Sequence, residues 1–170
     1  TVILPKANSD NFITLLKKLK VNFKSFSLSR ITKNYKVALK YIFFSPIEIF
    51  QLIYFFNKKN FDLVHVSGGS WQYKGLIAGK LSNKKVLWHL NDTSMPKIIK
   101  LLFSFFSNFA DGYIFASESS KKYYKSINKK SFNNKLEFII PSLGTLVIFC
   151  APIKPALTAS SKVLNNQPFF

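Results

Sequence analysis

The chain has 170 residues, of which 48% are hydrophobic, and its formal net charge is +18 at pH 7. This length and apolar content predict one folded domain with a real core and exclude a disordered tail. The single cysteine, Cys150, excludes an internal disulfide and a cysteine-based zinc site, and it fits a reducing compartment. We therefore expect a cytoplasmic globular protein.

The positive charge comes almost entirely from lysine, because Arg30 is the only arginine. A field of this size attracts anionic membranes, nucleic acid or phosphorylated ligands. Recognition of nucleic acid favours arginine, whose guanidinium makes bidentate contacts, so the composition favours lipid or phosphate as the partner. A second interpretation stays open, since the joint excess of Lys, Asn, Ile and Phe also fits a codon bias toward A and T.

Short apolar stretches alternate with stretches of helical periodicity along the first 141 residues. The predicted strands are 2–4, 23–28, 61–66, 86–90, 113–116 and 136–140, and the predicted helices are about 9–20, 35–57, 73–81, 94–109 and one from about 117. A break of the second helix before Pro46 is left open. Strands separated by helices of this length predict βαβ units and a mostly parallel sheet. The predicted fold is a Rossmann-like three-layer α/β/α domain.

Two apolar stretches, 41–56 and 98–109, fall short of a membrane span. Spanning a bilayer takes about 18–20 uninterrupted apolar residues, and polar residues interrupt both stretches. We predict that both are core-facing helices. After Pro141 the composition changes, with Lys154 and Lys162 as the only charges in 142–170. We predict a domain over 1–141, followed by a hinge and an irregular tail over 142–170 that is a truncated second domain or a shifted reading frame.

Polar side chains follow the predicted strands. His89, Asn91 and Asp92 lie at the end of strand 86–90, and His65 lies toward the end of strand 61–66. Ligands of open α/β sheets bind at the carboxyl ends of the strands. A histidine there can act as a general base or hydrogen-bond a sugar hydroxyl. The alternatives are a core histidine satisfied by backbone and, for Asp92, a residue that caps the next helix.

A Ser-Gly-Gly-Ser turn at 67–70 follows one strand and precedes a helix, which is the position of a phosphate-binding turn. The turn matches neither the Walker A pattern nor G-x-G-x-x-G, and a plain tight turn that needs no ligand is the better explanation. The seven acidic residues include no Asp-x-Asp pair, so we expect no metal site and no metal-dependent transferase of the kind built on such a pair.

Four short motifs occur in order along the chain. They are Phe-Asp-Leu-Val-His-Val at 61–66, Val-Leu-Trp-His-Leu-Asn-Asp-Thr at 86–93, Ala-Asp-Gly-Tyr-Ile-Phe-Ala-Ser-Glu at 110–118, and Phe-Ile-Ile-Pro-Ser at 138–142. Each alone is weak, but the four in order are fairly specific. Over about residues 1–141 the chain resembles the amino-terminal, acceptor-side domain of GT-B glycosyltransferases of the family 4 type.

The resemblance implies two Rossmann-like domains that face each other across a cleft and transfer a hexose without a metal. The donor would be a nucleotide sugar, which serves as substrate, with no further cofactor, and the acceptor a cell-envelope glycan or a lipid-linked sugar at the inner face of the membrane. The family's cleft histidine corresponds to His89 or, if the motif is aligned on the residue directly before Asp92, to Asn91. The substrate-binding positions that the resemblance implies are Asn91, Asp92, His65, Gly68, Gly69 and Glu118.

The chain also departs from this family. The family's first strand and glycine-rich loop would lie before Thr1 and its donor domain after the hinge, so we expect a fragment that is inactive alone. The hinge I-P-N-G is here Ile-Pro-Ser-Leu-Gly at 140–144. The alternative function is a non-catalytic basic module on an anionic membrane. In that case lysines would cluster on one surface beside stretch 41–56, the candidates being Lys17, Lys18, Lys20, Lys36 and Lys40.

Overall fold

The computed structural model describes residues 1–29, 35–69, 72–140 and 148–151, with the backbone alone at 35–39 and 148–151. The strands are β1 (Val2–Pro5), β2 (Phe23–Phe26), β3 (Leu63–Ser67), β4 (Lys85–Leu90), β5 (Gly112–Phe115), β6 (Leu136–Ile139) and β7 (Ile148–Ala151). The helices are α1 (Asp10–Lys18), α2 (Tyr35–Lys58), α3 (Tyr73–Leu81), α4 (Lys97–Phe106) and α5 (Glu118–Ile127), with 3-10 turns η2 (Ser107–Phe109) and η3 (Lys129–Phe132).

These strands form one sheet in the order β2-β1-β7-β3-β4-β5-β6. β1 pairs with β2 in parallel, and β3, β4, β5 and β6 pair in parallel in that order. β7 is antiparallel to both of its neighbours, β1 and β3. The alternation of strand and helix therefore produces a doubly wound Rossmann-like domain, and the predicted fold class is confirmed.

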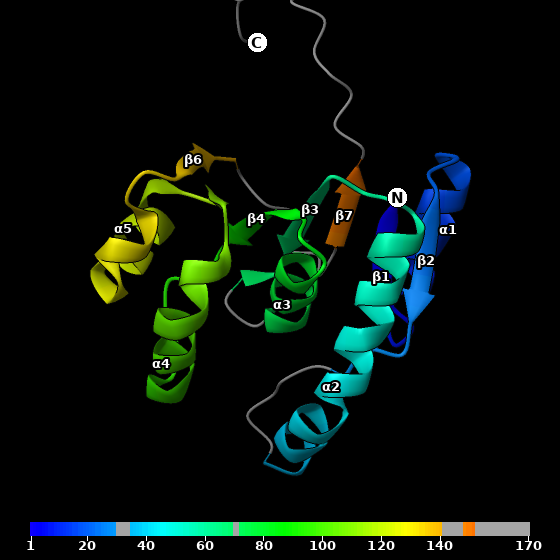
Figure 1. Cartoon of the computed structure of the whole chain (residues 1–170), viewed down its shortest axis with the longest axis horizontal. Helices are drawn as coiled ribbons and strands as arrows, with labels where there is room; N and C mark the ends of the chain where they lie inside the picture. The colour runs from blue at the N-terminus through cyan, green and yellow to red at the C-terminus, as the bar shows by residue number, and fades with distance from the viewer. Residues whose placement is uncertain (30–34, 70–71, 141–147, 152–170) are drawn as a thin grey trace, which may run out of the picture.

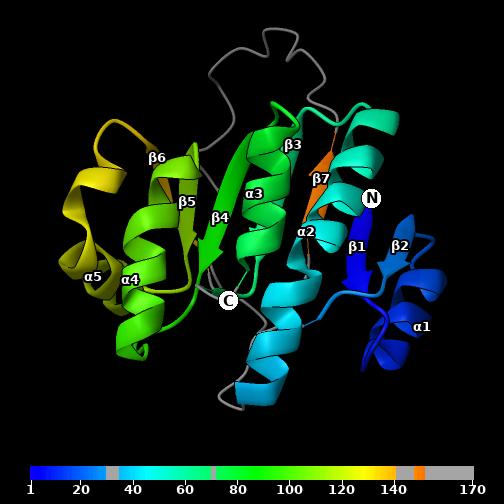
Figure 2. The same cartoon turned by 60° about the horizontal axis from the view of Figure 1, so that its bottom comes forward.

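The helices lie on both faces of the sheet. Alternate residues of β1 show this directly: Val2 and Leu4 pack with Leu16 of α1, whereas Ile3 belongs to a second cluster with Leu52 of α2. Because successive side chains of a strand point to opposite faces, α1 and α2 must cover opposite faces. Figure 1 and Figure 2 show α2, α3 and α4 together on one side of the sheet, with α3 in the middle.

Aromatic side chains fill the core between the sheet and this helical layer. Trp88 of β4 is fully buried, and its ring centroid lies 5.3 Å from that of Phe103 on α4. Phe103 in turn lies 4.8 Å from Tyr124 of α5, centroid to centroid. Gly79 of α3 allows the helix to approach the sheet closely, because a Cβ there would come within 2.7 Å of Val86 Cγ2. Strands β3 and β4 are thereby held rigidly against α3 and α4.

The structure decides the question left open at Pro46 and moves the start of one predicted helix. α2 runs without a break through Pro46. Proline lacks the N–H that would bond to the carbonyl of Ile42, and because Ile42 is 66% exposed, water can satisfy that carbonyl instead. The predicted helix 94–109 begins only at Lys97, with Pro96 at its N-cap, and continues as η2.

Strand β7 has no counterpart among the predicted elements. It lies within 142–170, for which the sequence predicts no regular structure, and it pairs with β1 at Val2↔Phe149 and with β3 at His65↔Phe149. The division into domains at residue 141 stays a prediction. Among the helices of the described residues, none has both the length and the apolar character that a membrane crossing requires.

Candidate functional site

The glycine turn after β3 meets the polar residues after β4. A Cβ added to Gly69 would lie 2.4 Å from Asn91 Oδ1 and 2.4 Å from Asp92 Oδ2, so only glycine fits there. Gly68 and Gly69 both have positive φ, at 121° and 72°. β3 and β4 are parallel neighbours, so their carboxyl ends lie at one edge of the sheet. Gly69, Asn91 and Asp92 therefore lie together at this edge, and their assignment to substrate stays a prediction.

Hydrogen bonds hold these two segments in place. Trp88 Nε1 donates to the carbonyl oxygen of Gly69 at 3.0 Å. Tyr124 Oη on α5 donates to Asp92 Oδ2 at 2.7 Å, and the Asp92 amide N–H donates to Tyr124 Oη at 3.2 Å. Asp92 does not cap α4, which begins five residues later at Lys97. Its carboxylate instead belongs to an edge cluster that we define as Gly69, Asn91, Asp92 and Tyr124.

The two histidines form a second group on β3 and β4. Their ring centroids lie 5.6 Å apart, and the rings are inclined by only 15°, so the imidazoles stack. The register explains this, because His89 pairs with Ser67, two residues beyond His65 and on the same face of the sheet. His65 lies in the middle of β3 rather than at its end, whereas His89 is the penultimate residue of β4.

Both imidazoles are neutral at physiological pH. Burial, and to a smaller extent the neighbouring His89, together lower the pKa of His65 to about 4. Burial also lowers the pKa of His89, and a hydrogen bond with the backbone of Ile140 opposes this. His89 is 6% exposed, and its Nε2 has no hydrogen-bond partner in the described part of the chain. A neutral imidazole with a free nitrogen can accept a proton.

In the described part of the chain, no hydrogen bond or ion pair joins the Glu118 side chain to either group. It is exposed in the first turn of α5, where a carboxylate favours the helix N-terminus. The cap of this helix is the pair Ser117 and Ser120, whose side chains each accept a hydrogen bond from the other residue's backbone N–H. The structure thus accounts for Glu118 by its helix alone, and its assignment to substrate remains a prediction.

Tyr124 and Trp88 do not stand out in the sequence as site residues. Trp88 is the fourth residue of a buried strand, and Tyr124 belongs to a lysine-rich stretch that is typical of a solvated helix. Tyr124 reaches Asp92 from α5, which packs against β5, and Trp88 reaches the carbonyl oxygen of Gly69 from the strand next to β3. Pattern alone does not reveal such a contact between residues 32 positions apart.

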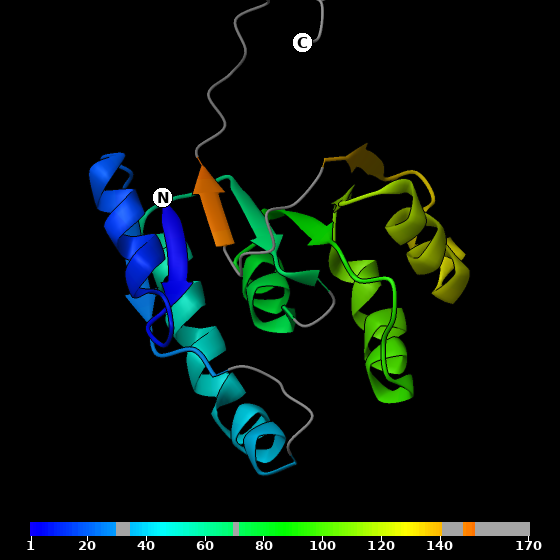
Figure 3. The ribbon, with the colours of Figure 1, turned by 180° about the vertical axis from the view of Figure 1, so that it is seen from behind.

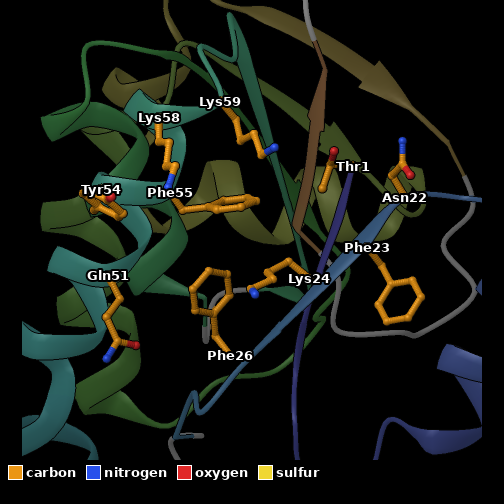
Figure 4. Close-up of a pocket in the computed structure, with 10 residues that line it drawn as sticks. All are labelled: Thr1, Asn22, Phe23, Lys24, Phe26, Gln51, Tyr54, Phe55, Lys58 and Lys59. Carbon is orange, nitrogen blue, oxygen red and sulfur yellow. The ribbon is translucent and has the colours of Figure 1, made fainter.

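A pocket of about 650 Å³ lies at the opposite edge of the sheet (Figure 4). It is lined at the start of β1 and β2 by Asn22 and Lys24 and on α2 by Phe55 and Lys58, among others. This is the amino-terminal edge of the parallel strands, whereas α/β sheets bind ligands at the carboxyl edge. We therefore place the candidate site at the edge cluster and the histidine pair.

No model of a known protein family matches this chain, and no curated protein matches its sequence.

Proposed function

We propose that this chain is the acceptor-side domain of a metal-independent glycosyltransferase. The reaction would transfer a hexose from a nucleotide sugar to a cell-envelope glycan or a lipid-linked acceptor. The observation that carries the proposal is the meeting of Gly69 with Asn91 and Asp92 at the carboxyl edge of β3 and β4. The type of reaction, glycosyl transfer, is inferred from the four motifs and their order along the chain, and Asn91 and Asp92 belong to one of these motifs.

In this proposal each group has a separate role. His89, the penultimate residue of β4, helps to position the acceptor at the carboxyl edge of the sheet. Asn91 and Asp92 hydrogen-bond the hydroxyls of the acceptor sugar, with Asp92 held in place by Tyr124. Basic side chains and helix termini stabilise the negative charge that develops on the nucleotide leaving group.

The proposal is tested by ligand binding to the 170-residue chain. The probe is a monosaccharide linked through diphosphate to a short isoprenoid, compared with the same isoprenoid diphosphate without the sugar. We expect saturable binding of the sugar-bearing probe, measured by calorimetry. His89→Asn and Asp92→Asn should each weaken it about tenfold, which corresponds to the loss of one hydrogen bond of about 1.4 kcal/mol.

Asp10→Asn is the matched control, because Asp10 is exposed on α1, outside the edge cluster. It removes the same charge and should leave the affinity unchanged. If all three variants bind alike, or if the sugar adds nothing to the affinity, the chain is instead a non-catalytic module that binds anionic lipid. Circular dichroism of each variant shows whether the fold is intact.

A further inference from the structure

The outer face of α2 is apolar. Phe43, Phe50 and Tyr54 are 75%, 69% and 66% exposed. They lie seven and four residues apart, so they form one line along the helix. The opposite side of the same helix is buried, with Leu52 and Phe56 fully covered. The sequence predicts that stretch 41–56 is a core-facing helix. In the structure only about half of its apolar side chains face the core, and the others are exposed.

α4 carries a second line of the same kind. Ile98, Leu101 and Phe105 are 68%, 72% and 64% exposed, whereas Ile99 and Phe103 are buried against the sheet. Helices α2 and α4 lie on the same side of the sheet, on either side of α3 (Figure 1, Figure 2). We call the six exposed side chains the apolar face: Phe43, Phe50, Tyr54, Ile98, Leu101 and Phe105. Soluble surfaces rarely leave large apolar side chains so densely exposed.

The charges beside the apolar face are all positive among the described residues of these two helices. Lys40 and Lys58 are exposed on α2, and Lys97 and Lys100 are exposed on α4. α4 contains no acid. The acid of α2, Glu48, is buried and ion-paired with Lys74, so it does not offset this charge.

We propose that the apolar face docks on the surface of an anionic phospholipid bilayer. The apolar side chains would enter the boundary between headgroups and acyl chains, and the four lysines would contact lipid phosphates. A second copy of the chain is a poor occupant, because two such faces would bring lysines together with no acid between them. This inference does not depend on the proposed glycosyl transfer.

The structure also changes which lysines are involved. Lys17, Lys18 and Lys20 lie on or just after α1, which covers the opposite face of the sheet from α2. They cannot lie beside the apolar face, so the predicted cluster on one surface is wrong for these three. Lys40 is beside it, and the side chain of Lys36 lies outside the described residues.

The test is flotation of the 170-residue chain with vesicles of phosphatidylcholine containing about 30% phosphatidylglycerol. We expect binding to these vesicles and not to pure phosphatidylcholine. Phe43→Glu/Phe50→Glu and Lys97→Glu/Lys100→Glu should each weaken binding at least about tenfold, the first through lost insertion and the second through charge reversal.

Leu15→Glu/Leu19→Glu and Lys17→Glu/Lys18→Glu are the matched controls. Leu15 and Leu19 are 45% and 60% exposed on α1, so these variants make the same changes on the other face of the sheet. They should keep most of the binding. Equal weakening by the α1 and α2 variants would mean that net charge alone drives binding, and it would overturn the proposal. The proposal would also be overturned if the unmodified chain were a dimer and Phe43→Glu/Phe50→Glu dissociated it.

Insertion has its own readout. Phe50→Trp should be quenched by phospholipids brominated on the acyl chain, and Leu19→Trp should not. Quenching of Leu19→Trp alone would place the lipid on the wrong face and contradict the proposal. Both substitutions are at exposed positions, and unchanged thermal unfolding confirms that each variant is folded.

Discussion

His65 and His89 share an interior environment that disfavours a positive charge. His89 is buried and His65 is partly buried, and each imidazole stacks on the other ring, which lies 5.6 Å away between centroids. Protonating either one would place a cation beside a second group that becomes cationic in the same pH range. Both imidazoles are therefore neutral in the folded protein at physiological pH, and protonating them at lower pH destabilises the fold.

We predict that the protein loses stability as pH falls from about 6.5 toward 4. The pKa of His65 is about 4 in the folded chain and 6.5 in the unfolded one, so the unfolded state binds the extra proton in this window. Stability is full above pH 6.5 and declines below it, by about 2 kcal/mol at pH 5. Urea unfolding at pH 7.5 and pH 5 measures this difference.

His65→Gln removes one of the two histidines with a lowered pKa and should reduce the dependence, and the part that remains belongs to His89. Carboxylates with ordinary pKa values contribute little above pH 5, so they do not obscure the comparison. A His65→Gln protein that still loses about 2 kcal/mol over this range would show that another group is responsible.

At the scale of elements, a buried ion pair joins α2 to α3. Lys74 Nζ lies 2.5 Å from Glu48 Oε2, and the two side chains are 6% and 7% exposed. The ammonium also donates to the carbonyl oxygen and hydroxyl of Ser29, at 3.0 and 2.7 Å, and lies 3.8 Å from the centroid of the Tyr41 ring. Burial lowers the pKa of Lys74, and the bond to Glu48 opposes this. The pair fixes the end of the β2 segment between the two helices.

Lys74→Met should cost about 3–5 kcal/mol in the free energy of unfolding, because it leaves the Glu48 carboxylate buried without a cation. Adding Glu48→Gln removes that charge and keeps an oxygen for the Ser29 amide, so the double variant should regain at least half. Denaturant unfolding measures both.

The exposed pair Lys80–Asp111 provides the control, since its atoms are 3.5 Å apart and the Lys80 side chain is 48% exposed. Lys80→Met should cost less than about 1 kcal/mol. Similar losses at Lys74 and Lys80 would contradict the role given to burial.

At the scale of the whole molecule, β7 connects two parts of the sheet. On one side lie β1 and β2 with α1, and on the other lies the parallel set from β3 to β6. Strand β7 occupies the place between β1 and β3 and pairs with both (Figure 3). The continuity of the hydrogen-bonded sheet therefore depends on a strand that comes from the far end of the described chain.

Phe149→Pro should destabilise the whole domain by about 3 kcal/mol or more, because proline cannot donate to the ladder of a central strand. Phe149→Ala keeps the amide N–H and should cost less. Thermal unfolding measured in parallel by circular dichroism and by tryptophan fluorescence tests both. If Phe149→Pro unfolds like the unmodified chain, β7 contributes nothing to stability.

Local sequence patterns are sufficient to predict the fold class and the positions of most elements. The periodicity of two in buried strands and of 3.6 in helices is local, so helix 73–81 was predicted with the bounds that α3 has. The site edge was also predictable, because Gly69, Asn91 and Asp92 directly follow adjacent strands of a parallel sheet.

The contacts between distant segments could not be predicted from local patterns and are known from the folded structure. Tyr124 on Asp92, Lys74 on Glu48 and β7 between β1 and β3 each join residues that no local pattern relates. The same is true of the apolar face: periodicity shows that α2 and α4 are apolar, but not which side the sheet covers. Such partners are selected by packing and by the burial of polar groups, which depend on the whole chain at once.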